Sequence, residues 1–546
     1  MRLDYTSDLW WKNALIYCLD VETYRDTNGD GVGDFRGLIE RVDHLAALGV
    51  TCVWLMPFYP SPNRDDGYDI TDFYGVDPRL GTLGDFVEFV RTARDRGLRV
   101  IVDLVVNHTS DEHPWFVESR SSLDSPRRNW YVWRDEPAPS PADLAFPGQE
   151  TSNWQRDRRT GTYYLHRFRH FQPDLNIANP AVRDEICKIA AFWLALGVCG
   201  VRMDAVPFLL ELDGISHPQD GDPKGWLRSL RAFVCRRAGE AMLLGEVNAQ
   251  MQELSSYFGG RDGDALHMEF AFLLNQSLWL ALAREEAEPL EQVISTLPHV
   301  PRDNAWATFL RNHDELTLDK LTVTQREEVF AAFGPREEMQ LFGRGLRRRT
   351  ATMLGGDGPR LRMAWSLMLS LPGTPVLFMG DEIGMGEQLL IPDRYAVRVP
   401  MQWSPERNGG FSNAPSDALV RPQAGGAFGP GKVNVADQRR DAGSLLRFVQ
   451  HLIHRRREAP ELGWGNSTLI ETKDPAVFAH RCDWEGSTVI AIHNLGSRPA
   501  TAELSLGDDA TGVHDLLAES DEPAGRGGTF AVELEGYGGR WLRVRR

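Results

Sequence analysis

Eight short apolar runs, most of them followed by a segment of helical periodicity, constrain the fold of this 546-residue chain more than any other feature. The first two are ALIYCLDVETY at residue 14 and VTCVWLMPFY at residue 50, and the last two are AWATFLRNHD at residue 305 and TPVLFMGDEI at residue 374. Apolar strands that alternate with helices are typical of a parallel sheet covered on its outer face. Eight such units predict an α/β fold, a closed (β/α)8 TIM barrel.

Two regions interrupt this alternation. Residues 107–176, after the third run, are polar and rich in Trp, Arg, Pro and Ser, and a connection of that length is normally a small inserted domain. Beyond about residue 462, short strands separated by turn residues predict an antiparallel β-sandwich. We therefore expect a barrel domain A in residues 1–106 and 177–461, an inserted domain B in 107–176 and a C-terminal β-sandwich in 462–546.

The composition limits the partners. The formal net charge of −17 repels nucleic acid and anionic membranes but is indifferent to a neutral sugar. The six cysteines form no CxxC pair, which indicates free thiols in a reducing cytoplasm. The N-terminus resembles no signal peptide, and no run approaches the roughly 20 apolar residues that span a bilayer. We expect a cytoplasmic protein without nucleic-acid or membrane partners; its oligomeric state, including a homo-oligomer, stays open.

Polar side chains gather at the predicted ends of the barrel strands, the edge where TIM barrels hold their functional groups. They are Asp103, Asn107, His108, Arg202, Asp204, Glu246, Asn312, His313 and Asp314. Arg202 and Asp204 lie two residues apart on one strand and point the same way, so the guanidinium helps to keep the carboxylate ionised. One carboxylate alone could merely cap a helix, but three around one barrel mouth indicate a catalytic site.

Cleavage of a glycosidic bond uses such carboxylates. One carboxylate forms a covalent glycosyl intermediate, and a protonated carboxylic acid about 5 Å away protonates the leaving oxygen. A third can stabilise the positive charge that develops on the sugar ring.

The stretches DLVVNH, GVRMDAVP, LLGEVN and FLRNHDE resemble the four ordered signature regions of the α-amylase family, glycoside hydrolase family 13, and QPDLN resembles a fifth. The resemblance runs from about Trp10 to the end of the chain. It implies that Asp204 is the nucleophile, Glu246 the general acid/base and Asp314 the transition-state stabiliser. The implied sugar-binding residues of the first subsite are Asp65, Tyr68, His108, Gln172, Arg202, His313 and Arg398.

A finer resemblance, in PFYPSPNRDDGYDI, NHTSDEHPWF and RVPMQWSPERNGGFS, is to the trehalose synthase branch of that family. It implies a retaining enzyme that interconverts maltose and trehalose, both neutral α-glucosides, by intramolecular glucosyl transfer. We expect domain B and the loop near Phe411 to cover the site. The connection at residues 212–224 departs from that branch, so some hydrolysis to glucose is expected as well.

Three other interpretations remain open. The nearest is an α-glucosidase or small-substrate α-amylase, which differs only in whether water reaches the intermediate. A non-catalytic barrel that binds sugar is more remote, as is a metal-dependent barrel hydrolase, which would need more histidines at the strand ends than His108 and His313.

The segment DTNGDGVGD places oxygen donors at alternate positions with glycines between, the spacing that a Ca²⁺ loop needs. The family resemblance agrees, with Asp26, Asn28, Asp30 and Asp34 supplying side chains and Val32 a carbonyl; the alternative is an Asx-rich turn without an ion. The resemblance alone implies a second Ca²⁺ site, with side chains of Asn107, Asp174 and Glu211 and carbonyls of Phe208 and Leu209. No organic cofactor is expected.

Overall fold

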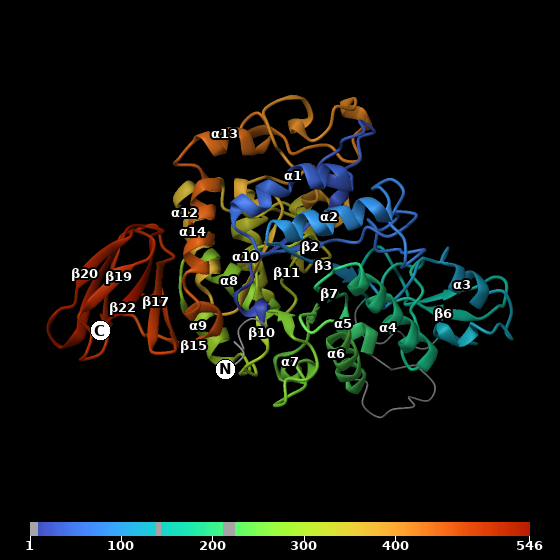
Figure 1. The fold of residues 1–546 in the computed structure, drawn as a ribbon, viewed down its shortest axis with the longest axis horizontal. Helices are drawn as coiled ribbons and strands as arrows, with labels where there is room; N and C mark the ends of the chain where they lie inside the picture. The colour runs from blue at the N-terminus through green and yellow to red at the C-terminus, as the bar shows by residue number, and fades with distance from the viewer. Residues whose placement is uncertain (1–8, 138–143, 211–223) are drawn as a thin grey trace.

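The eight apolar runs form the eight strands of a closed barrel in the computed structural model, which describes residues 9–137, 144–210 and 224–546 (Figure 1). Neighbouring strands are parallel, and β14 pairs back with β1 to close the ring. In order around the barrel they are β1 (Ile16–Leu19), β2 (Cys52–Leu55), β3 (Arg99–Leu104), β7 (Gly200–Met203), β8 (Met242–Gly245), β9 (Met268–Phe270), β10 (Ala305–Thr308) and β14 (Thr374–Phe378). The predicted TIM barrel is confirmed.

Helices surround the barrel, and several begin at a residue that the sequence supplies as a cap. The Asp34 carboxylate accepts from the Gly37 N–H at the start of α1, and Gly49, at φ 95°, ends that helix. Thr82 and Asp85 form a reciprocal capping box at the start of α2. The longer helices are α1 (Phe35–Leu48), α2 (Leu83–Asp95), α4 (Pro180–Ala195), α6 (Gly225–Arg237), α8 (Phe272–Arg284), α9 (Glu288–Thr296), α10 (Val323–Phe333), α12 (Gly358–Ser370) and α14 (Leu445–Arg457). The shorter ones are α3 (Pro114–Ser119), α5 (Val206–Leu210), α7 (Met251–Tyr257), α11 (Thr350–Met353), α13 (Val435–Arg440) and α15 (Glu461–Trp464).

The segment between β3 and α4 has a sheet of its own. Its antiparallel strands lie in the order β4 (Trp133–Arg134), β6 (Tyr163–Leu165) and β5 (Trp154–Arg156), and a small apolar cluster of Val132, Trp154 and Leu165 packs on it. The two ends of the segment lie side by side, because the Leu175 N–H donates to the Asn107 carbonyl at 2.9 Å. A second small sheet, β11 (Leu316–Thr317), β13 (Gly345–Leu346) and β12 (Gln340–Leu341), follows β10.

The C-terminal strands form the predicted antiparallel sandwich. Alternate side chains of β18 and β21 are buried, so one face of this pair packs inward on the larger sheet around a shared apolar core. The larger sheet has the order β15 (Asn466–Leu469), β16 (Val477–Trp484), β17 (Ser487–Asn494), β22 (Gly539–Arg545), β19 (Gly512–Asp515) and β20 (Ser520–Pro523), and the smaller pairs β18 (Ala500–Ser505) with β21 (Thr529–Leu534).

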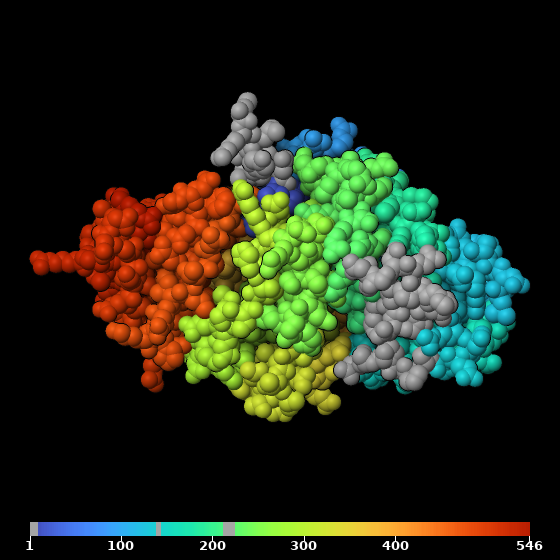
Figure 2. Space-filling model, turned by 90° about the horizontal axis from the view of Figure 1, so that it is seen from below, coloured from blue at the N-terminus to red at the C-terminus, as the bar shows by residue number. Residues whose placement is uncertain are grey.

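The sandwich and the β4–β6 sheet lie at opposite ends of the molecule, with the barrel between them (Figures 1 and 2). Within the described ranges, no helix is both long enough and apolar enough to cross a membrane.

Helix α12 of the barrel anchors the sandwich. The indole N–H of Trp541 on β22 donates to the Ser366 hydroxyl at 3.1 Å, and His493 on β17 lies 2.9 Å from the same oxygen. Trp541 is fully buried and belongs to the apolar core of the barrel rather than to that of the sandwich. The two domains therefore share one continuous core across α12.

We predict that Trp541→Ala lowers the free energy of unfolding by about 3–5 kcal/mol, because removing the buried indole leaves a cavity at this junction. Urea or thermal denaturation measures the change. Leu390→Ala is the control, since Leu390 is 89% exposed and its loss should change stability by no more than about 0.5 kcal/mol. Equal stability of the two variants would contradict the shared core.

Candidate active site

Three carboxylates, Asp204, Glu246 and Asp314, line one cavity of about 340 Å³ at the carboxyl ends of the barrel strands. Asp204 follows β7 directly, Glu246 follows β8, and Asp314 lies six residues beyond β10. A volume of this size is near the lower end of the roughly 300–1,000 Å³ range of small-molecule sites. The structure thus brings together the three side chains that the sequence motifs assign to catalysis.

The guanidinium of Arg202 joins two of these carboxylates. Its Nη1 donates to Asp204 at 2.5 Å and to Asp103 at 2.8 Å, and its Nη2 donates to Glu246 at 2.6 Å. Arg202 is 1% exposed, so its bonds to Asp103 and Asp204 are shielded from water, whereas the Glu246 side chain is 24% exposed. Because one planar group holds both carboxylates, their separation and orientation are fixed by a single side chain.

The backbone next to Asp204 adopts a strained conformation that brings a hydrogen-bond donor to Glu246. Ala205 has a φ of 48°, a left-handed conformation that costs a non-glycine residue about 1 kcal/mol. In this conformation its N–H donates to the Glu246 carboxylate at 3.2 Å. Glu246 is therefore held from both the β7 strand end and the turn that follows it.

Burial raises the pKa of both carboxyl groups that share Arg202. The pKa of Glu246 rises to about 7, because desolvation and the nearby Asp204 and Asp314 outweigh the attraction of Arg202. Burial also raises the pKa of Asp204, and Arg202 at 2.5 Å opposes that rise. A carboxyl group that titrates near neutral pH can donate a proton and later accept one, as a general acid/base must.

The pKa of Asp314 is shifted in the opposite direction, downward. Burial disfavours its ionised form, but His313, Arg394 and Arg398 together hold the pKa of its carboxyl well below the usual range. Arg398 donates to one carboxylate oxygen at 2.7 Å, and Arg394 lies 3.1 Å from the same oxygen. Asp314 stays ionised across the physiological range, which suits a group that stabilises positive charge.

The residues predicted to bind the first sugar divide into two layers. Asp65, Tyr68 and His108 line the cavity, while four others contact these or the catalytic carboxylates from behind: Gln172, Arg202, His313 and Arg398. Gln172 donates to Asp65 at 2.9 Å and lies 3.2 Å from His108. Tyr68 and His313 stack with a 2.7 Å contact between hydroxyl and imidazole. Burial lowers the pKa of His108 to about 4, so it is neutral at the pH of the cell.

Several members of this site were not predicted. Arg394 lines the cavity and donates to Asp65 at 2.8 Å. Asp103 was predicted at the end of its strand, but its contact with Arg202, whose guanidinium donates to it at 2.8 Å, was not. Asp66 accepts from Arg398 at 2.5 Å and also from Arg421. The sequence offered one clue to Asp66 and Arg394, because each stands close to a predicted residue. Asp66 follows Asp65, and Arg394 precedes Arg398 by four residues. Nothing in the sequence indicated Arg421, which approaches from 355 residues away.

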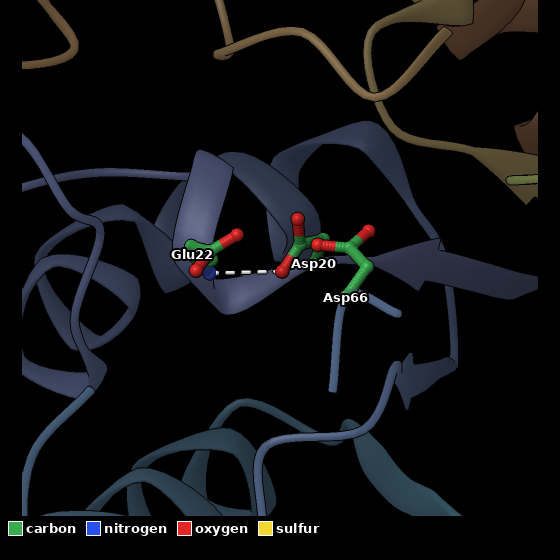
Figure 3. Close-up of side chains that lie close together, drawn as sticks. All are labelled: Asp20, Glu22 and Asp66. Atoms are coloured by element: carbon green, nitrogen blue, oxygen red, sulfur yellow. Dashed lines mark hydrogen bonds between the residues drawn. The ribbon is translucent and has the colours of Figure 1, made fainter. Parts of the chain in front are cut away.

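One group of acidic side chains in the described ranges has the spacing of metal ligands. It consists of Asp20, Glu22 and Asp66, whose carboxylate oxygens lie within 4.8 Å of one another (Figure 3). Arginines occupy these oxygens: Arg79 donates to Glu22 at 2.6 Å, and Arg421 reaches all three carboxylates. The arrangement is an ion-pair network behind Arg398 and not a vacant set of ligands.

Aromatic side chains from the segment between β3 and α4 form one wall of the cavity. Phe146 and Phe168 line it, with ring centroids 5.9 Å apart, and Phe168 contacts Phe208 of α5 at 5.6 Å. Such faces stack well on the apolar faces of sugar rings. We expected this segment to cover the active site, and the position of Phe146 and Phe168 in the cavity lining supports that expectation. Phe411, expected to contribute, is fully buried beside Asp26 and does not line the cavity.

The Asp26–Asp34 loop has donors that fit a hard cation. Asp26 is 1% exposed, and among the described residues its carboxylate accepts from neutral groups: the N–H groups of Gly29 and Gly31 and the Ser412 hydroxyl. Across the described ranges, no Lys or Arg nitrogen lies within 4 Å of the carboxylates of Asp26, Asp30 and Asp34. A buried carboxylate without a counter-charge is costly, and a cation would remove that cost.

Of the second set of predicted Ca²⁺ ligands, Asn107 and Asp174 lie together, with the amide N–H donating to the carboxylate at 3.3 Å. Phe208 and Leu209 belong to α5. Glu211 lies outside the described residues.

Comparison with known proteins agrees with this site. The family described as alpha amylase, catalytic domain, matches residues 19–332 and 342–465, and a sucrose hydrolase-like C-terminal domain matches residues 486–543. The chain is 40% identical over 544 residues to the trehalose synthase/amylase of Mycobacterium tuberculosis, over 98% of this chain and 90% of that protein. It is 38% identical over 551 residues to the trehalose synthase of Pimelobacter sp., over 98% and 96% of the two chains. A crystal structure of a trehalulose synthase mutant superposes with a TM-score of 0.78 at 27% identity, over 98% of this chain and all of that one.

A barrel with three acidic groups at its mouth defines a glycoside-active enzyme, and these matches place this chain in the α-amylase family. The family resemblance predicted from the sequence motifs is confirmed.

We predict that kcat/KM falls as the pH rises through about 7, because Glu246 must be protonated to release the leaving group and its pKa is about 7. Glu246→Gln should lower kcat by about 100- to 10,000-fold and remove this alkaline decline. Initial rates with an α-glucoside between pH 5 and pH 9 measure both effects. An alkaline decline that survives in Glu246→Gln would assign it to another group.

Proposed function

We propose that this chain interconverts maltose and trehalose by intramolecular glucosyl transfer with retention, and releases some glucose by hydrolysis. The principal support is the Arg202 bridge, which holds the Asp204 and Glu246 carboxyl groups together in one cavity and leaves Glu246 with a pKa of about 7. Two relatives of this chain, similar over nearly its whole length, are named trehalose synthases, which favours this reaction over others of the family.

In the first step a carboxylate oxygen of Asp204 attacks the anomeric carbon of the non-reducing glucose. The bond to the leaving oxygen breaks, and the Glu246 carboxyl gives its proton to that oxygen, so free glucose and a β-glucosyl ester result. Asp314, kept ionised by Arg394 and Arg398, stabilises the oxocarbenium character of the transition state.

In the second step an acceptor hydroxyl attacks the same carbon. The Glu246 carboxylate takes the hydroxyl proton, the ester bond to Asp204 breaks, and the α configuration is restored by this second inversion. If the acceptor is the anomeric hydroxyl of the retained glucose, the product is trehalose; if it is the 4-hydroxyl, maltose is restored. Water as the acceptor gives glucose.

The choice among these acceptors depends on whether glucose stays in the cavity. Phe146, Phe168 and Phe208 line the same cavity as the carboxylates and offer apolar faces to a sugar. A site that excludes bulk water favours the retained glucose as acceptor.

We predict that the purified protein converts maltose to trehalose, and trehalose to maltose, with glucose as a minor product of both reactions. Chromatography of the sugars over time measures this outcome. Asp204→Asn, which cannot form the glycosyl ester, is the matched control and should show no conversion. Glucose alone, with trehalose absent in either direction, would make the protein an α-glucosidase; conversion by Asp204→Asn would remove Asp204 from the mechanism.

We also propose that the protein works in a reducing compartment, the cytoplasm, on neutral α-glucosides. All six cysteines are free thiols, and three of them, Cys18, Cys52 and Cys482, are buried. The net charge of −17 does not hinder the approach of an uncharged disaccharide.

A Ca²⁺ ion in the Asp26–Asp34 loop is a further part of the proposal, supported by the buried and uncompensated Asp26 carboxylate. We predict that 1 mM Ca²⁺ raises the melting temperature relative to EDTA, and that Asp30→Ala removes most of this increase while kcat changes little. Asp124→Ala, an exposed aspartate elsewhere, is the control. Elemental analysis that finds no bound calcium, together with equal melting temperatures with and without Ca²⁺, would contradict the site.

A further inference from the structure

A second cavity, of about 270 Å³, is lined by three arginines and shares no lining residue with the catalytic cavity. Arg25 follows the η2 turn (Val21–Thr23), Arg41 lies on α1, and Arg439 lies on α13. In Figure 1 the segment with α13 runs beside α1, and the Arg439 guanidinium reaches His44 of α1 at 3.1 Å. Two neighbouring segments near the N-terminus and a third, almost 400 residues further along the chain, therefore place positive charge around one cavity.

Arg41 has no acidic partner in this cavity. Within the described ranges, no carboxylate lies within 4 Å of its guanidinium, and its buried Nε has no hydrogen-bond acceptor. Its guanidinium lies 4.8 Å from the ring centroid of Trp403, a cation–π contact that positions the group but does not bond its N–H donors. Burial and the neighbouring Arg25 lower the pKa of Arg41, which shows the cost of leaving this charge uncompensated.

The other two arginines are held in place by neutral or distant groups. Arg25 donates to the carbonyl of Phe411 at 2.7 Å, and the nearest carboxylate oxygen, of the half-exposed Glu40, is 3.7 Å from its Nε. The Arg439 guanidinium lies 3.1 Å from Nδ1 of His44. One acidic residue, the exposed Glu406, lines the cavity. Three guanidinium groups thus face one carboxylate.

This local excess of positive charge stands in a protein of net charge −17. The surrounding field repels anions in general, so an anion that binds here must be recognised by the cavity itself. Guanidinium groups match the oxygens of phosphate with paired N–H donors, and three of them from different directions suit a group with several oxygens better than a carboxylate with two.

We propose that the cavity lined by Arg25, Arg41 and Arg439 binds a phosphate group, either free phosphate or the phosphate of a small phosphorylated sugar. The Ser404 and Asn413 side chains, which also line the cavity, supply further polar groups. The buried Trp403 provides an apolar wall, and the space exceeds the size of a phosphate ion, since one water takes about 30 Å³ in the liquid.

The test is isothermal titration of the full chain with inorganic phosphate at about 0.15 M salt. We expect one saturable site per chain. Arg41→Gln and Arg439→Gln should each weaken binding by about tenfold or more, because each removes a charge-assisted contact. Arg439 is exposed, so its variant tests the site even if Arg41→Gln does not fold.

Arg36→Gln is the matched control, because it removes one charge from α1 at a side chain that is 76% exposed, paired with Asp85 and absent from the cavity lining. It should bind phosphate as the unmodified protein does. A second arm titrates glucose 6-phosphate: tighter binding than inorganic phosphate identifies a phosphorylated sugar, and equal binding identifies the phosphate alone as the recognised group. Absence of saturable binding in both arms, or equal weakening in all three variants, would overturn the proposal.

Discussion

The buried guanidinium of Arg202 is the interaction on which the rest of the site depends. Asp103, Asp204 and Glu246 converge on it, and without it three carboxyl groups would be crowded in a region with little water. Its charge lowers the pKa of all three carboxyl groups and so opposes the rise that burial causes. The barrel makes this possible, because β3, β7 and β8 are adjacent and end at the same edge.

Around this centre, charges alternate in sign as the network extends outward. Asp314 is held by Arg394 and Arg398, and these arginines pair in turn with Asp65 and Asp66. Arg421 adds a further positive charge next to Asp66. Removing one member would leave a buried partner unpaired, which usually costs more than the pair contributes when it is intact. The low pKa of Asp314 is therefore a property of the network and not of one neighbour.

The segment between β3 and α4 supplies part of the wall of the catalytic cavity. Its aromatic residues Phe146 and Phe168 line the cavity that holds the carboxylates, and its two ends are joined by the backbone pairing of His108 with Asp174. Members of the α-amylase family share the barrel and the carboxylates. The walls of the cavity determine how long a released sugar stays near the intermediate, and hence whether it or water reacts.

The sequence determined the barrel and the three carboxylates, because both follow from local patterns. Apolar runs of strand length specify buried parallel strands, and residues such as Asp204 and Glu246 stand directly at the ends of those runs. Short strands separated by turn residues likewise predicted the sandwich. The roles of Asp103, Asp66, Arg394 and Arg421 were decided by the tertiary structure alone, since a salt bridge across 355 residues leaves no periodic signal in the chain. The pKa of Glu246 was also a tertiary outcome, because it depends on burial and on charges from other strands. For the same reason the position of Phe411, buried away from the cavity, could not be found from the sequence.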